Sequence, residues 1–247
     1  MNLYVGTSGY SYKEWKGNFY PDNLSDKEML RYYATKLSTV EINNTFYRLP
    51  KESVLQSWAD QVPADFRFSI KASQRITHIK RLRDVLDETE YLVRIVRILG
   101  ERLGVILFQL PPNLKKDLPR LEQFLKQLPG DIRAAFEFRH ASWFDEETFA
   151  ALRANRVALC IADADNELDI PFVGTADWGY LRLRREEYSP ASLKSWMKKI
   201  QSQKWESAFV FFKHEDEGTG PKLAAQFLKL AGSESAKAPS GKKRKAK

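Results

Sequence analysis

Short apolar segments alternate with amphipathic segments along most of this chain, and that alternation constrains the fold more than any other feature. Some of the apolar runs, such as Val105-Ile106-Leu107-Phe108, are continuous, which is typical of strands covered on both faces. Regular alternation of strands and helices indicates βα units around a parallel sheet. Eight segments have the composition and length of strands: residues 3–8, 39–43, 67–71, 104–110, 133–139, 158–163, 179–183 and 208–213.

The intervening segments predict helices, with one exception. Residues 164–178 are too polar and too rich in turn-forming residues for a crossover helix. We therefore predict an α/β fold, a TIM-barrel-like parallel (β/α)8 barrel that is irregular between strands six and seven; an open doubly wound sheet is the alternative. The 247-residue length suits one barrel, so we expect a single domain over residues 1–232. The expected helices cover residues 26–37, 51–61, 81–102, 117–128, 145–155, 189–202 and 221–231.

Much of the positive charge lies in the C-terminal tail. The net charge is +8, but residues 233–247 contribute +5, so residues 1–232 carry only +3. The tail has no large apolar residue, and we expect it to be disordered. Its basic run, residues 242–245, could bind nucleic acid through phosphates; a solvated tail that only aids solubility is the alternative.

Other features of the sequence exclude several classes of protein. No apolar run is long enough to span a bilayer, and the first residues lack the pattern of a signal sequence, so we expect a cytoplasmic protein that does not bind membranes. The single cysteine, Cys160, lies in an apolar run and is expected to be a buried thiol. We make no prediction of a cofactor or of the oligomeric state.

Polar residues close nearly every predicted strand. In a parallel barrel the active site is built from the carboxyl ends of the strands, so these residues are the candidates for function. The most unusual is Glu137, which lies between Phe136 and Phe138 in an otherwise apolar strand. Burial would raise its pKa and a nearby Arg139 or another cation would lower it, so Glu137 is either a tuned catalytic carboxylate or part of a buried ion pair.

All three histidines follow predicted strands: His78, His140 and His214. Histidine titrates near neutral pH and is a common metal ligand, so acid–base chemistry or a metal site would use such positions. No two of these histidines have metal-ligand spacing on one helix, and a hydrogen-bonded structural role is the alternative.

Several motifs together resemble the YecE-like proteins, grouped as domain of unknown function 72. The resemblance spreads over the body of the chain in the expected order. It is carried by Gly6-Thr7-Ser8-Gly9-Tyr10, Trp15, Gly17, Phe19-Tyr20-Pro21, residues 40–50, Phe68 through Lys71, Thr77-His78, Gln109-Leu110-Pro111-Pro112, Glu137-Phe138-Arg139-His140, Ser142-Trp143 and Asp163.

The resemblance implies a TIM-barrel-like fold and no established activity. Its motif positions imply a pocket formed by Asn43, Lys71, His78, Gln109, Glu137, Arg139, Trp143 and Asp163. Members of the family commonly end strand seven in Arg-Leu-His-Gly and strand eight in Asn-Asn-Asp. This chain instead has Arg182-Leu183-Arg184-Arg185 and Lys213-His214-Glu215-Asp216, so roles at these two ends are less firmly implied.

Our leading hypothesis is an enzyme that acts on a small anionic, phosphate- or nucleotide-like substrate; a hydrolase is the first reaction class to consider. A metal-dependent phosphodiester hydrolase resembling TIM-barrel endonucleases is one alternative, with ligands among the histidines, Glu137, Asp163 and Asp216. A non-enzymatic nucleic-acid-binding protein is the other. In the leading hypothesis the catalytic residues are Glu137, Asp163 and His78, and the ligand-binding residues are Asn43, Lys71, Gln109, Arg139, Trp143, Arg182 and Lys213.

Overall fold

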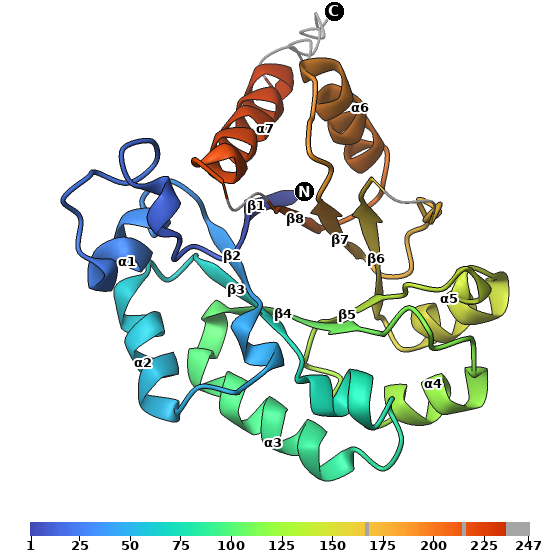
Figure 1. The fold of residues 1–247 in the computed structure, drawn as a ribbon. Coiled ribbons are helices and arrows are strands. Elements are labelled where there is room, and N and C mark those ends of the chain that lie inside the picture. The colour runs from blue at the N-terminus through green and yellow to red at the C-terminus, as the bar shows by residue number, and fades with distance from the viewer. Residues whose placement is uncertain (166–167, 214–215, 236–247) are drawn as a thin grey trace, which may run out of the picture.

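The computed structural model describes residues 1–165, 168–213 and 216–235, and in these residues eight parallel strands close into a barrel (Figure 1). β1 pairs with β8 from Asn2 opposite Ser207 to Thr7 opposite Phe212, which closes the ring. The TIM-barrel-like prediction is therefore confirmed, and the open sheet is excluded. The strands are β1 (Asn2–Ser8), β2 (Thr39–Ile42), β3 (Arg67–Lys71), β4 (Leu103–Gln109), β5 (Ala134–Glu137), β6 (Ala158–Asp163), β7 (Trp178–Leu183) and β8 (Ser207–Phe212).

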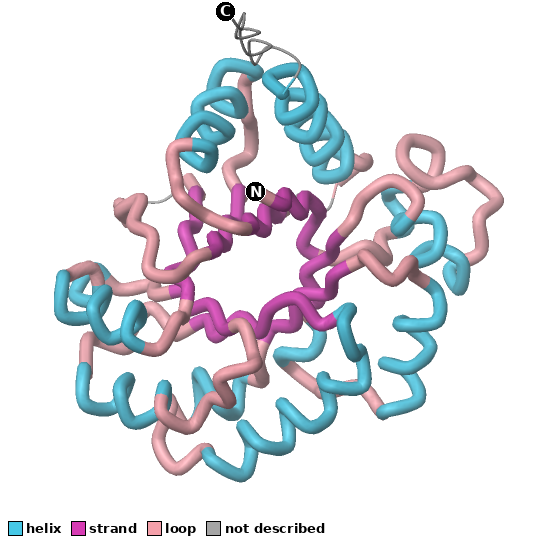
Figure 2. The backbone as a smooth tube through the Cα atoms, turned by 180° about the vertical axis from the view of Figure 1, so that it is seen from behind, coloured by secondary structure: helices cyan, strands magenta, loops and turns pink. Residues whose placement is uncertain are grey.

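Helices surround the ring of strands, as both views of the backbone show (Figures 1 and 2). Short single-turn helices lie in several of the loops that follow strands. The longer helices are α1 (Met29–Ala34), α2 (Glu52–Gln61), α3 (Leu86–Val96), α4 (Leu118–Leu125), α5 (Glu146–Ala154), α6 (Pro190–Gln201) and α7 (Thr219–Ser235).

Both faces of the strands are buried, which explains their continuous apolar runs. Successive side chains of a strand point to opposite faces of the sheet. In β8, Phe209 and Phe211 fill the barrel interior, whereas Val210 and Phe212 pack in the larger core between strands and helices. The interior cluster also contains the buried thiol of Cys160. The same alternation decides which polar residues at the strand ends face the mouth of the barrel.

The connection between β6 and β7 is irregular, as predicted. The described residues between Asp163 and Trp178 contain no helix. Part of this segment is anchored by Thr175, whose Oγ1 accepts a 2.7 Å hydrogen bond from Leu159 N and donates a 2.8 Å bond to Val157 O. The loop is thereby tied to β6 without a crossover helix.

One predicted helix, residues 81–102, has different boundaries in the structure. Arg81, Leu82 and Asp84 have φ values of 50°, 66° and 49°, which a right-handed helix cannot contain. α3 therefore begins only at Leu86, and a turn of π-helix (Arg75–Ile79) follows β3 instead. That turn carries His78 to the mouth of the barrel.

Among the described helices, none is both long and apolar enough to cross a bilayer. Most of the basic tail, residues 236–247, lies outside the described residues, so the prediction of disorder there is not tested.

Candidate functional site

A buried ion cluster lies across the barrel just below its mouth, at the carboxyl ends of the strands. At its centre is Arg182, on β7, whose side chain is 3% exposed. Its Nη2 donates to Glu41 Oε1 on β2 at 2.8 Å, and its Nη1 donates to Glu137 Oε2 on β5 at 2.6 Å. One guanidinium thus joins two carboxylates that come from distant parts of the sequence.

Glu41 is held by a full set of hydrogen-bond donors. Tyr180 Oη donates to its Oε2 at 2.6 Å, and Ser8 Oγ and Asn43 Nδ2 donate to its Oε1 at 2.7 Å and 3.1 Å. Burial opposes ionisation, but Arg182 and these donors outweigh it and hold the pKa of Glu41 below its usual value. Glu41 is therefore an ionised and immobile part of the cluster.

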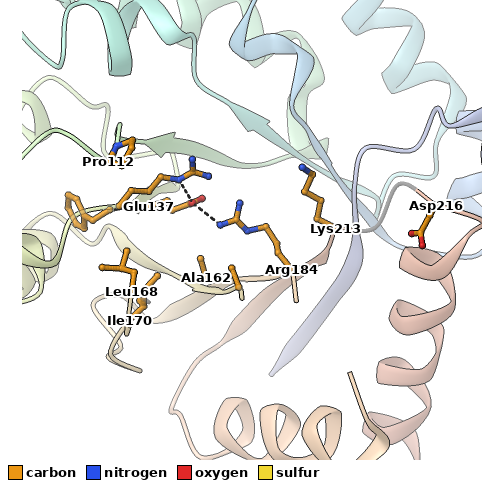
Figure 3. Close-up of a pocket in the computed structure, with 11 residues that line it drawn as sticks. Pro112, Glu137, Ala162, Leu168, Ile170, Arg184, Lys213 and Asp216 are labelled. Atoms are coloured by element: carbon orange, nitrogen blue, oxygen red, sulfur yellow. Dashed lines mark hydrogen bonds and ion pairs between the residues drawn. The ribbon is translucent and has the colours of Figure 1, made fainter. Parts of the chain in front are cut away.

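Glu137 is surrounded by three guanidinium groups. Besides Arg182, its Oε1 accepts from Arg139 Nε at 3.0 Å and Arg184 Nη2 at 3.4 Å (Figure 3). Burial again opposes ionisation, yet the three positive charges hold the pKa of Glu137 well below its usual range. Such a carboxylate stays ionised at neutral pH and keeps the arginines in place, which makes it a poor proton donor or acceptor.

A cavity of about 470 Å³ opens above this cluster. None of the described residues that line it carries a carboxylate, whereas two lysines and three arginines do line it. A cavity lined by this excess of positively charged side chains favours the binding of anions. Its lining consists of Tyr12, Asn43, Phe46, Tyr47, Lys71, His78, Gln109, Arg139, Arg182, Arg184 and Lys213.

Lys71 and His78 both lie against the ring of Phe46 in this cavity. Lys71 Nζ is 4.2 Å from the ring centroid, and the His78 ring packs edge-on at 4.8 Å. Burial and the charge of Arg182 lower the pKa of Lys71 to about 8. Burial and the charges of Lys71 and Arg139 lower the pKa of His78 to about 4, so its imidazole is neutral at pH 7.

A second cavity, of about 790 Å³, adjoins the first and shares Arg139, Arg184 and Lys213 with it. Its far side is more apolar, with Leu168 and Ile170 across Arg184 from Lys213 (Figure 3). The shared cations therefore lie between the first, polar cavity and the second, more apolar cavity.

The structure brings most of the predicted site residues together. The first cavity contains His78 and six of the predicted ligand-binding residues: Asn43, Lys71, Gln109, Arg139, Arg182 and Lys213. Glu137 lies under that cavity and lines the second.

Asp163 and Trp143 are not part of either lining. Ala162 faces the barrel mouth, so the next residue, Asp163, faces the helices. There its carboxylate accepts from Tyr188 Oη at 3.0 Å and Trp196 Nε1 at 3.1 Å. Trp143 is 1% exposed, and its Nε1 donates to Leu114 O at 2.8 Å. Neither residue lines the two cavities, and the catalytic role of Asp163 and the ligand-binding role of Trp143 stay predictions.

Glu41, Tyr180 and Arg184 are members of the site that sequence reasoning did not select. Glu41 has the same sequence pattern as Glu137, a carboxylate between two apolar strand residues, here Val40 and Ile42. Arg184 lies two residues after Arg182 and so shares its inward face. Tyr180 gave no comparable signal, since a tyrosine in an apolar strand is an ordinary core residue.

The described residues contain no group of three or more His, Cys, Asp or Glu side chains that could hold a metal ion. His140 lies apart from His78, and its Nδ1 accepts from Ser142 N at 3.1 Å in the loop after β5. His214 lies outside the described residues.

Comparison with known proteins agrees with this architecture. The family model described as a protein of unknown function, DUF72, matches residues 4–246. The chain belongs to the DUF72 family. UPF0759 protein YunF of Bacillus subtilis is a relative that is 24% identical over 92% of this chain and 94% of its own length. UPF0759 protein YecE of Escherichia coli is 35% identical over 58% of this chain and 50% of its own length.

Two solved DUF72 structures have the same fold. A DUF72 family protein from Thermotoga maritima superposes with a TM-score of 0.83 and 28% identity, over 94% of this chain and all of that one. One from Enterococcus faecalis gives a TM-score of 0.72 at 17% identity, over 94% of this chain and 98% of that one. The resemblance read from the sequence motifs is thereby confirmed.

Proposed function

We propose that this DUF72 protein is an enzyme that acts on a small anionic, phosphate-like substrate bound in the cavity above Arg182. The observation that carries the proposal is the cavity lining, which contains five cationic side chains and, among the described residues, no carboxylate. The two carboxylates beneath it pair with Arg182, and Glu137 also pairs with Arg139 and Arg184, but two carboxylates do not neutralise five cations.

The arrangement also provides groups that can take part in a reaction. Lys71 faces the cavity with a pKa lowered to about 8, as expected of a group that reacts near neutral pH. The neutral imidazole of His78 faces the same cavity and can donate or accept a hydrogen bond there. The amide groups of Asn43 and Gln109 can hydrogen-bond to a substrate and orient it. A binding surface alone has no need of such reactive groups.

Anion binding can be tested with a matched pair of variants. Arg139 lies in the cavity at the carboxyl end of β5, whereas Arg133 is exposed at the opposite end of the same strand. We expect inorganic phosphate and AMP to raise the melting temperature of the wild type and of Arg133→Gln. Arg139→Gln should bind at least about tenfold more weakly in titration calorimetry, since a charge-assisted contact is lost.

Failure of every tested phosphate compound to stabilise the wild type would refute the proposal. Equal binding by Arg139→Gln and Arg133→Gln would place the anion outside this cavity.

A further inference from the structure

Lys71 differs from the arginines around it because no described carboxylate forms an ion pair with it. Arg139 and Arg184 both pair with Glu137, and Arg182 pairs with Glu137 and Glu41. No carboxylate of the described residues forms an ion pair with Lys71. Its Nζ lies over the Phe46 ring and lines the cavity. Burial and the charge of Arg182 therefore make the ammonium form less stable than in an ordinary surface lysine, without an ion pair in the described residues to offset them.

The consequence is a population of neutral amine. With a pKa of about 8, about a tenth of Lys71 is unprotonated at pH 7, against less than a thousandth for a lysine with an unperturbed pKa. The neutral amine is the nucleophilic form, and partial burial beside other cations is how enzymes activate lysines for attack on carbonyl groups. The fixed arginines beside Lys71 would hold the anionic group of such a substrate.

We propose that Lys71 Nζ forms a Schiff base with the carbonyl carbon of a small phosphorylated aldehyde or ketone, whose phosphate is held by Arg139 and Arg184. This inference rests on the proposed function and specifies its substrate class. The second cavity, which shares Arg139, Arg184 and Lys213 with the first, leaves room for the remainder of the substrate.

The step balances without a redox partner. The Nζ lone pair forms a bond to the carbonyl carbon, and the carbonyl oxygen takes up a proton to give a carbinolamine. Nitrogen then forms the C=N double bond as that oxygen leaves with a second proton as water. The two hydrogens lost by nitrogen equal those in the water released. Hydrolysis of the C=N bond by water is the reverse reaction and restores the free lysine.

His78 is placed to move these protons. Thr77 Oγ1 and Nδ1 of His78 lie 2.9 Å apart. With Nδ1 as the donor to this hydroxyl, Nε2 of the neutral imidazole is the proton acceptor. Because His78 and Lys71 pack on the same ring, Nε2 can serve the reaction at Nζ.

The test is reductive trapping in the full-length protein. Dihydroxyacetone phosphate with sodium cyanoborohydride should add one reduced adduct per chain, and peptide mapping should place it on Lys71. Labelling should be at least about tenfold faster than at any other lysine, and its rate should rise with pH to a plateau above about pH 8. Dihydroxyacetone, which lacks the phosphate, should label Lys71 at least about tenfold more slowly.

Two variants serve as controls. Lys71→Arg keeps the positive charge but has no nucleophilic amine, so it should lose the adduct while phosphate still stabilises it. Lys204→Met removes an exposed lysine just before β8, at the opposite end of the barrel, and should be labelled like the wild type.

The possible failures are distinguishable. Adducts spread evenly over surface lysines, or no adduct in a wild type that phosphate still stabilises, would overturn the Schiff base and leave the anion-binding proposal standing. No stabilisation by phosphate, with equal labelling by dihydroxyacetone and its phosphate, would overturn both.

Discussion

At the scale of single residues, Glu137 resolves the two interpretations that its sequence position allowed. It lies in a buried ion cluster with Arg182 and is 1% exposed. A carboxylate whose pKa is held so low does not exchange protons near neutral pH. Glu137 fixes the arginines beneath the cavity, and Lys71, with a pKa of about 8, titrates closer to neutral pH.

Glu137→Gln should destabilise the protein strongly, because it leaves the buried Arg182 with one carboxylate and Arg139 and Arg184 with none. Removal of one partner from a buried ion pair costs about 3–5 kcal/mol. Urea unfolding at pH 7 should show a loss of this size. Glu101→Gln, at an exposed position, is the control and should change stability by less than about 0.5 kcal/mol. A similar small change in both variants would contradict the structural role.

Lys71→Met should stabilise the protein at pH 7. The pKa of Lys71 in the folded protein, about 8, is lower than the 10.5 of a free lysine, so its charged form opposes folding at any pH below 8. That cost shrinks between pH 8 and 10.5 and is absent above. The difference between the two pKa values corresponds to about 3 kcal/mol, and solvent screening of this partly buried side chain reduces it. Unfolding of the variant should therefore require about 1–2 kcal/mol more than the wild type at pH 7, with no advantage left near pH 10.5. A pH-independent difference would exclude this origin.

At the scale of secondary-structure elements, β6 shows how strand alternation assigns roles. Cys160 and Ala162 face the barrel interior, so Asp163 faces outward, where it binds Tyr188 before α6 and Trp196 within it. The last residue of a strand is thus a structural link between the sheet and the next helix. Inclusion of Asp163 among the catalytic candidates followed from its place at a strand end, without regard to which face it occupied.

Asp163→Ala should distinguish a structural role of this carboxylate from a role in ligand binding or catalysis. Loss of the carboxylate removes the acceptor of Trp196 Nε1 and the shorter of two hydrogen bonds from Tyr188 Oη to Asp163, and a buried donor left unsatisfied costs about 1–3 kcal/mol. The melting temperature should fall, while the affinity for phosphate, measured below that temperature, should equal that of the wild type. Weaker phosphate binding at equal folded fraction would return Asp163 to the site.

At the scale of the whole molecule, the positive charge serves two separate regions. Inside the barrel, the cations of the mouth are ordered by two buried carboxylates. In the tail, residues 236–247 contain six basic and no acidic residues. The prediction that the tail binds phosphate backbones rests on this composition alone.

Deletion of residues 236–247 should weaken binding to DNA or RNA and flatten its salt dependence, because each released cation contributes to the slope. The deletion should leave α7 and phosphate binding in the cavity unaffected. Fluorescence anisotropy with a labelled oligonucleotide at several salt concentrations measures both quantities. Equal affinities for the full-length and truncated chains would show that the tail is a solvated segment without this role.

The sequence by itself determined the order of strands and helices and favoured a barrel over an open sheet. Strand composition, helix periodicity and the polar interval at 164–178 are local properties, and together they specify the order of elements and the irregular connection after β6. It also indicated most of the residues at the mouth, because parallel strands always bring their carboxyl ends to one side. The sequence did not predict the turn at Arg81, Leu82 and Asp84, since nothing in the composition of these residues indicates positive φ values.

Only the tertiary structure decided what those residues do. Positions 41, 137 and 182 are far apart in the chain, and their contacts depend on barrel closure and on which face each side chain takes. Electrostatic energy falls with distance and rises with burial, so neither a pKa nor a role can be read before both are known. Closure of the barrel therefore converted a row of polar strand ends into a fixed ion cluster, with Lys71 in the cavity above it and outside the ion pairs of the described residues.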